Sequence, residues 1–290
     1  MDEHIRKNKP NISASTLKTY MSLLRSLYYK KHERGSEIKL NWFSNQDEVI
    51  KLLEDKAPAS RKTTYAALIA VTDSNDKYKS AMMDDSKVYE KFMKTQEKTD
   101  KQAASWKDYD EVKKIYDDMH NKVKPLLKAE ELSPADYKKL QDFVILSLTS
   151  GVWIPPRRSL DWVDLKIKNI FKKNDNYIDK NSFVFNKYKT AKVYGEQRVE
   201  IPKGLKTILM KFIRFNPHEY LLTDDQGKKM TNVRLTQKLN RIFGNNISTS
   251  MLRHIYLSNQ LKDIPRLEEL ERIAKDMGHS VMEGLEYVKH

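Results

Sequence analysis

The stretch VDLKIKNIFKKNDNYIDKNSFVFNKYKTAKVYGEQRVE, residues 163–200, decides the fold that the sequence predicts. Apolar and polar side chains alternate in three short runs within it, at residues 165–170, 182–185 and 198–201. A period of two is typical of strands with one buried face. Turn-forming residues separate the runs: Asn174, Asp175 and residues 192–195. We therefore expect a small three-stranded antiparallel sheet.

Helical periodicity predicts that the chain is helical on both sides of this sheet. Apolar residues recur at intervals of three and four, which is typical of helices with one buried face. Ser133 and Pro134 supply an N-cap and a first helical residue, and Ser15 or Thr16 is expected to cap an earlier helix. The helices expected before the sheet cover residues 15–28, 46–53, 60–71, 80–93, 106–123 and 134–148. Helices return from residue 205, so the fold class is mainly α with a small antiparallel β-sheet.

The polar stretch TQEKTDKQAA, residues 95–104, has little apolar periodicity and predicts a linker. We expect an N-terminal helical domain over residues 1–97, a linker over 98–105 and a second, α+β domain over 106–290. The first hundred residues carry 19 basic and 15 acidic side chains, a net +4, and the rest carry 35 and 25, a net +10. Most of the excess positive charge therefore belongs to the second domain.

The composition excludes several classes of protein. The 290 residues carry 54 Lys and Arg against 40 Asp and Glu, a net +14, which favours a nucleic-acid partner. The absence of cysteine excludes disulfides, a thiol nucleophile and Cys-ligated metals. The longest apolar run, residues 65–71, is far short of the ~20 residues of a membrane helix. The N-terminus lacks the apolar core of a signal peptide, so we expect an intracellular protein that is neither secreted nor membrane-bound.

Three segments near the C-terminus carry candidate chemistry. They are SMLRHIYLSNQL at residues 250–261, MGHS at 277–280 and LEYVKH at 285–290. Leu252 and Ile255 make one face of the first segment apolar, so Arg253 and His254 are expected at the buried end of a helix. Gly278 fits the position that ends the preceding helix, and Tyr287 follows His279 by eight residues.

In this order, the three segments resemble the C-terminal motifs of the tyrosine recombinase (phage integrase) family: an HxxR box, an LGHxS-like turn and a nucleophilic tyrosine. The resemblance implies a helical core-binding domain over residues 1–97 and a catalytic domain over 106–290. It implies that Tyr287 is the nucleophile and that Arg253 and His279 bind the scissile phosphate.

The family pattern also implies two residues upstream. An arginine is expected before the first strand, where GVWIPPRRSLDWVDLKI offers two. Arg158 is preferred, because Asp161 completes an R-x-x-E/D pattern with it, and Arg157 is the alternative. A lysine is expected in the hairpin between the second and third strands, where Lys189 is preferred and Lys192 is second.

One position departs from the family. Ser250 stands where the HxxR box usually has histidine, and serine is a poor base at neutral pH. His254 would point about 100° away on the same helix. The proton-transfer role would then fall to Lys189 or to water, or be weakened.

The residue types fit the implied chemistry without a cofactor or a metal. Two guanidiniums can neutralise the charge that develops on a phosphorane, and a lysine can protonate the leaving 5′ oxygen. A tyrosine can attack phosphorus to give a 3′-phosphotyrosyl link. The expected function is therefore site-specific DNA recombination or integration, for a virus or mobile element.

The expected partner is double-stranded DNA, bound by a homotetramer, and the free protein is expected to be a monomer. The expected location is wherever that DNA is, in the host cytoplasm or nucleus or in a virion. Three alternatives stay open: DNA relaxation by a type IB topoisomerase-like enzyme, DNA binding by a catalytically weakened relative, and an unrelated basic RNA-binding protein.

Overall fold

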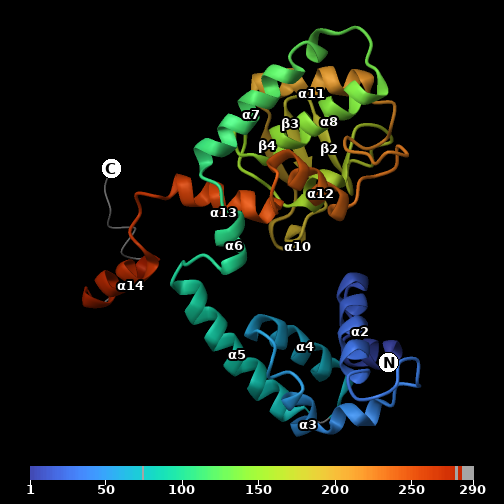
Figure 1. The fold of residues 1–290 in the computed structure, drawn as a ribbon, viewed down its shortest axis with the longest axis vertical. Helices are drawn as coiled ribbons and strands as arrows, with labels where there is room; N and C mark the ends of the chain where they lie inside the picture. Colours follow the sequence, from blue (N-terminus) through green and yellow to red (C-terminus); the bar gives the residue numbers. More distant parts are fainter. Residues whose placement is uncertain (74, 278–279, 283–290) are drawn as a thin grey trace. The chain divides into compact units, whose positions relative to one another are not determined.

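The computed structural model describes residues 1–73, 75–277 and 280–282. They form two compact units, one of Met1–Glu97 with the segment that begins at Pro265, and one of Lys98–Ile264. Figure 1 shows the elements of each unit. Among the described residues, no helix is long and apolar enough to cross a membrane.

The secondary structure described in the first unit is helical, as the sequence predicts for residues 1–97. Tyr78 is fully buried and donates a 2.6 Å hydrogen bond to the Phe43 carbonyl. Ser13, rather than Ser15 or Thr16, caps the second helix by accepting from the Thr16 amide at 3.1 Å. The helices are α1 (Asp2–Asn8), α2 (Ala14–Tyr28), the 3₁₀ helix η1 (Leu40–Ser44), α3 (Gln46–Lys51), α4 (Pro58–Val71), α5 (Asp76–Lys94) and α14 (Leu267–Asp276).

Helix α14 lies in the sequence range predicted for the catalytic domain, yet it contacts the end of α5. Lys94 Nζ lies 2.9 Å from Glu271 Oε1, and the Leu267 amide donates to Gln96 Oε1 at 2.9 Å. The predicted linker also contains structure, because a short helix occupies most of it. Thr99 caps this helix, and the Gln102 side chain accepts from the Thr99 amide in return.

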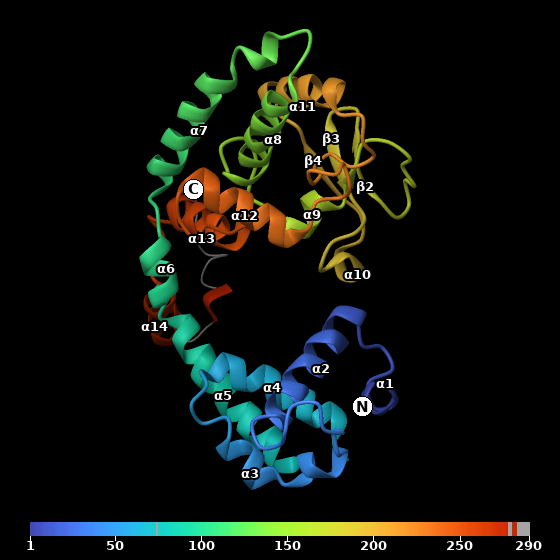
Figure 2. The ribbon, with the colours of Figure 1, turned by 45° about the vertical axis from the view of Figure 1, so that its right-hand side comes forward.

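The second unit surrounds helix α8, whose last ten residues are almost all buried. Helices α7, α11 and α12 pack against it (Figure 2). Ser133 caps α8 and Pro134 begins it, as predicted. The helices of this unit are α6 (Asp100–Ser105), α7 (Tyr109–Val123), η2 (Leu126–Lys128), α8 (Pro134–Thr149), α9 (Ser159–Val163), α10 (Ala191–Tyr194), α11 (Lys203–Phe215), α12 (Asn232–Phe243) and α13 (Thr249–Gln260).

The sheet has four strands in the order β1-β2-β3-β4, and it is mixed, so the expectation of three antiparallel strands was wrong. Strands β2 and β3 pair antiparallel, as do β3 and β4, but β1 runs parallel to β2. The strands are β1 (Leu165–Lys166), β2 (Asn176–Asp179), β3 (Ser182–Phe185) and β4 (Gln197–Glu200). Trp162 of α9 is fully buried and packs edge-on against Phe183 and Phe185 of β3.

The missed strand β2 follows Asn174 and Asp175 directly and begins with Asn176, another turn-forming residue. Asn176 is completely buried here. Its side-chain amide donates to the carbonyls of Asp161 and Lys187 at 3.1 and 2.9 Å, and its oxygen accepts from the Asn186 and Lys187 amides at 3.0 and 2.8 Å. These four bonds satisfy a buried polar side chain, so a residue typical of turns is stable inside the sheet.

Candidate active site

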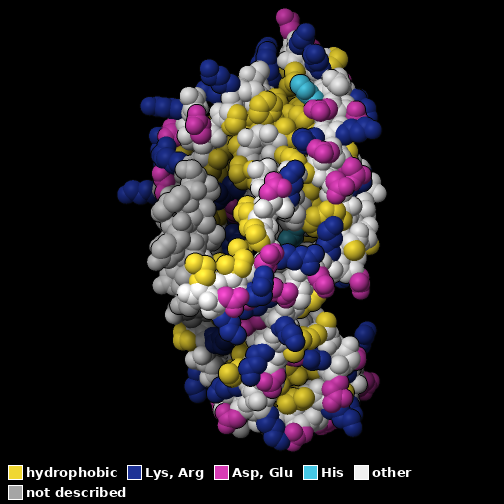
Figure 3. Space-filling model, turned by 90° about the vertical axis from the view of Figure 1, so that its left-hand side faces the viewer, with side chains coloured by type: hydrophobic (Ala, Val, Ile, Leu, Met, Phe, Trp, Pro, Cys, Tyr) yellow, Lys and Arg dark blue, Asp and Glu magenta, His cyan; other side chains and the backbone are white. Residues whose placement is uncertain are grey.

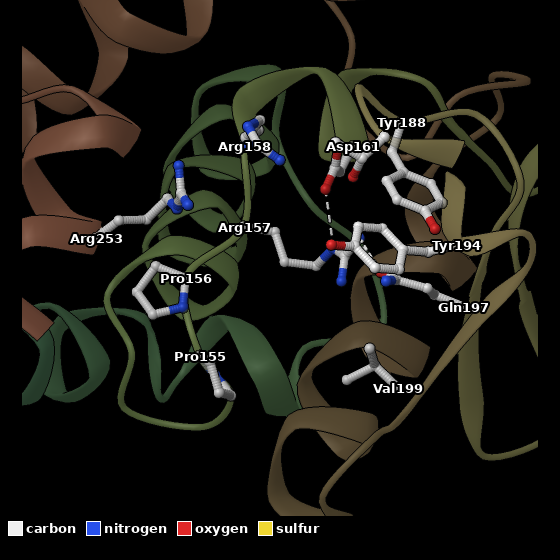
Figure 4. A pocket seen from close by; sticks show the side chains of 11 residues that line it. Pro155, Pro156, Arg157, Arg158, Asp161, Tyr188, Tyr194, Gln197, Val199 and Arg253 are labelled. Atoms are coloured by element: carbon white, nitrogen blue, oxygen red, sulfur yellow. Dashed lines mark hydrogen bonds and ion pairs between the residues drawn. The ribbon is translucent and has the colours of Figure 1, made fainter. Parts of the chain in front are cut away.

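A pocket of about 320 Å³ opens in the second unit where three segments of the chain meet (Figure 4). These segments are the loop before α9 with the start of that helix, the hairpin from β3 to β4, and helix α13. The residues that line the pocket are Pro155, Pro156, Arg157, Arg158, Asp161, Tyr188, Thr190, Tyr194, Gln197, Val199 and Arg253. The pocket is therefore lined by two predicted site residues, Arg158 and Arg253, and by the alternative Arg157.

Arg157 is fixed from four sides. Its Nε donates to Asp161 Oδ2 at 2.9 Å, and its Nη2 donates to Gln197 Oε1 at 3.0 Å. Its guanidinium also lies 4.0 Å from the centre of the Phe185 ring and 5.6 Å from that of Tyr188. Because these contacts come from α9, β3, β4 and the hairpin, Arg157 ties the loop to the sheet.

Asp161 forms the floor of this arrangement. The residue is only 2% exposed, and its Oδ1 atom is buried without a hydrogen-bond partner among the described residues. Burial raises the pKa of Asp161, while the charges of Arg157, Arg158 and Arg253 oppose that rise. Desolvation therefore favours the neutral form of the Asp161 carboxyl, whereas the three neighbouring cations favour its ionised form.

Arg158 and Arg253 are the two arginines of the pocket that have no such tie. Both are half-buried, and neither side chain forms a hydrogen bond or ion pair with a described residue. Their backbones are held together, because the hydroxyls of Ser159 and Thr249, at the starts of α9 and α13, lie 3.2 Å apart. Two guanidiniums are thus positioned beside the pocket with their donors available.

Helix α13 holds Arg253 in place through its apolar face. Met251, Leu252 and Ile255 are buried, and the Tyr256 ring contacts Tyr109 edge-on at 5.9 Å. The expectation that His254 lies at the buried end with Arg253 was wrong, because His254 is exposed. The apolar periodicity of α13 turns that position outward, one residue beyond the arginine.

The remaining predicted residues lie elsewhere. Lys189 and Lys192 are exposed on the hairpin and do not line the pocket, and Ser250 is exposed in the first turn of α13. Trp153, which precedes these arginines in the same loop, donates from its indole to Tyr116 Oη at 2.6 Å. His279 and Tyr287 lie outside the described residues.

The pocket also contains residues that sequence reasoning missed, chiefly Tyr188, Tyr194 and Gln197. The Tyr188 hydroxyl donates to the Gly195 carbonyl at 2.7 Å and so closes the hairpin. A signal for the two tyrosines is present in the segment KYKTAKVY, residues 187–194, where aromatic and basic side chains interleave. That pattern is typical of surfaces that contact nucleic acid.

The charges of the pocket suit an anion. Three guanidiniums face one buried carboxyl, so the site is positive even when Asp161 is ionised. On the face drawn in Figure 3, by contrast, Lys and Arg side chains are interspersed with Asp and Glu. The described residues include no group of three or more His, Asp or Glu side chains placed to hold a metal ion.

Comparison of the chain with protein-family models and with curated proteins finds no match. The pocket and the motifs of the sequence are therefore the evidence for function.

Proposed function

We propose that this chain is a tyrosine recombinase that cleaves and rejoins DNA strands through a 3′-phosphotyrosyl intermediate. The observation that supports it most is that Arg158 and Arg253, which lie 95 residues apart in the sequence, line one pocket with their guanidiniums unpaired by described residues. A phosphodiester has two non-bridging oxygens, and two guanidiniums can neutralise the charge that builds on them.

In the proposed reaction the Tyr287 hydroxyl loses its proton to water as its oxygen attacks the scissile phosphorus, and the bond from phosphorus to the 5′ oxygen breaks. Lys189 of the hairpin gives its proton to the departing 5′ oxygen. Arg158 and Arg253 hold the non-bridging oxygens, with His279 as a further donor. One phosphodiester is exchanged for another, so the free 5′-hydroxyl of a second strand can reverse the step without ATP.

Arg157 has a different role in this proposal. Its donors are already bonded to Asp161 and Gln197, so it supports the wall of the pocket and leaves the phosphate to Arg158. The active species would be a homotetramer on double-stranded DNA, which exchanges two pairs of strands.

The test is covalent capture. The protein is incubated with nicked duplexes taken from the DNA that flanks its own gene, and adducts that survive SDS are counted. Wild type should form an adduct, and Tyr287→Phe and Arg158→Ala should not. Arg198→Ala is the matched control, because Arg198 is half-exposed on β4, pairs with Asp179 and Glu196 and does not line the pocket.

Two outcomes favour the alternatives. A wild-type protein that binds these duplexes tightly but forms no adduct is a DNA-binding relative without catalysis. A protein that relaxes supercoiled plasmid of any sequence as a monomer is a topoisomerase. Ser250→His adds a further check, since it should hold or raise the yield of adduct if Ser250 occupies the position of the usual histidine.

A further inference from the structure

The β3–β4 hairpin contributes two tyrosines to the pocket, and the structure treats them differently. Tyr188 is held by contacts within the protein, because its hydroxyl donates to the Gly195 carbonyl and its ring faces the Arg157 guanidinium. Tyr194 lines the same pocket but is 67% exposed, and no described residue bonds to its hydroxyl. Figure 4 shows both rings on the side of the pocket away from Arg253.

The size of the pocket exceeds what a phosphate alone requires. Its volume of about 320 Å³ is roughly that of ten water molecules in the liquid, whereas a phosphate has five heavy atoms. In a nucleic acid every phosphate is bonded to a sugar that carries a base. An anion held by Arg158 and Arg253 therefore brings a nucleoside to the remaining space, where an open aromatic ring is available.

We propose that Tyr194 is a stacking platform for the base of the nucleotide whose phosphate occupies the arginine pocket. This inference rests on the proposed function and adds a positioning residue to it. An exposed aromatic ring on a hairpin turn offers a flat face to any of the four bases, so the contact selects for the presence of a base rather than for its identity.

Two features of the hairpin support the ring as the contacting group. Gly195 follows Tyr194 with a φ of 65°, in the left-handed region, and its carbonyl accepts from Tyr188, so the backbone that carries the ring is fixed. The neighbouring Val193 is 76% exposed and does not line the pocket. The hairpin thus directs one specific side chain into the site and provides a matched residue outside it.

The test uses two small probes that differ only in the presence of a base. Thymidine 3′,5′-bisphosphate carries one base, and 2-deoxyribose 3′,5′-bisphosphate carries none. Their dissociation constants for the full-length protein are measured by calorimetry or NMR titration. Wild type should bind the probe with a base about 5- to 150-fold more tightly, the range expected for one base stacked on an aromatic ring.

The variants form a double-mutant cycle with the base. Tyr194→Ala should abolish the preference for thymidine bisphosphate, whereas Tyr194→Phe and the control Val193→Ala should keep it. A preference that survives Tyr194→Ala, or one that is lost in Tyr194→Phe, overturns the stacking contact; the second result assigns the effect to the hydroxyl.

The arginine variants separate this proposal from the function that it rests on. Arg158→Ala and Arg253→Ala should weaken both probes by the same factor, because both probes carry the phosphates. If they do so while Tyr194→Ala changes nothing, only the stacking contact is wrong. If they leave both probes unaffected, the pocket is not the phosphate site and the proposed function fails together with the stacking contact.

Discussion

Replacement of Arg157 by alanine should destabilise the second unit far more than the same change at Arg158. The Arg157 side chain is 18% exposed and that of its partner Asp161 is 3% exposed. Removal of one member of a buried ion pair costs about 3–5 kcal/mol, because the other charge is left without compensation. Arg158 has no such partner among the described residues, so Arg158→Ala should change stability by no more than about 0.5 kcal/mol.

The free energy of unfolding can be measured with urea and tryptophan fluorescence. Three of the four tryptophans, Trp106, Trp153 and Trp162, belong to the second unit, so the signal reports chiefly on its unfolding. The loss in Arg157→Ala should be largest near about pH 7 and should shrink as pH falls through the raised pKa of Asp161, because a neutral carboxyl needs no opposite charge.

For phosphate binding we expect the opposite order of effects from that for stability. Arg158→Ala should lose phosphate binding while keeping its stability, and it therefore serves as the control for Arg157→Ala. Equal losses of stability in the two variants, or a loss under about 1 kcal/mol in Arg157→Ala, would refute the assignment of Arg157 as the structural member of the pair.

Three further predictions follow from single residues. Burial raises the pKa of Asp161, so the folded protein binds this proton more tightly than the unfolded chain, and wild type loses stability as pH rises above about 4. The stability of wild type should therefore fall relative to that of Asp161→Asn as pH rises from about 4 to about 7, and a difference between the two proteins that does not change with pH would contradict this. Gly151 has a φ of 86°, and an added Cβ would lie 2.5 Å from Tyr256 Cδ2. Gly151→Ala should therefore lower the free energy of unfolding by about 1–3 kcal/mol. An unchanged melting temperature would show that this loop adapts freely. Lys189 is exposed on the hairpin. If it contacts a DNA phosphate, Lys189→Ala should reduce the slope of the logarithm of the DNA-binding constant against the logarithm of salt concentration by about 0.9. The same slope in titrations of wild type and variant would exclude that contact.

The sequence predicted the helices well because their signals are local. Ser133 and Pro134 mark the start of α8, and its apolar run is long enough to leave no competing interpretation. The sheet was predicted only in part. Asn176 is typical of a turn by composition, and only hydrogen bonds to the distant residues 161, 186 and 187 make it part of a strand. No local pattern carries that information.

The pair of arginines shows the same limit at the candidate site. The spacing of three residues between Arg158 and Asp161 favoured an association between them. The structure gives the carboxylate to Arg157, four residues away, because Arg158 is the N-cap of α9 with extended backbone angles and its side chain leaves in another direction. The two tyrosines of the hairpin were missed because their approach to Arg157 depends on how β3 pairs with β4.

The spread of the pocket residues along the chain has a consequence for synthesis. The lining begins at Pro155 and is completed by Arg253 on α13, and Thr249 of the same helix bonds to Ser159. A chain that grows from its N-terminus can form the sheet and bury Asp161 before α13 has left the ribosome, but it cannot close the pocket. The complete cluster of guanidiniums thus forms only after Arg253 has been synthesised, and before that point the nascent chain exposes an incomplete site.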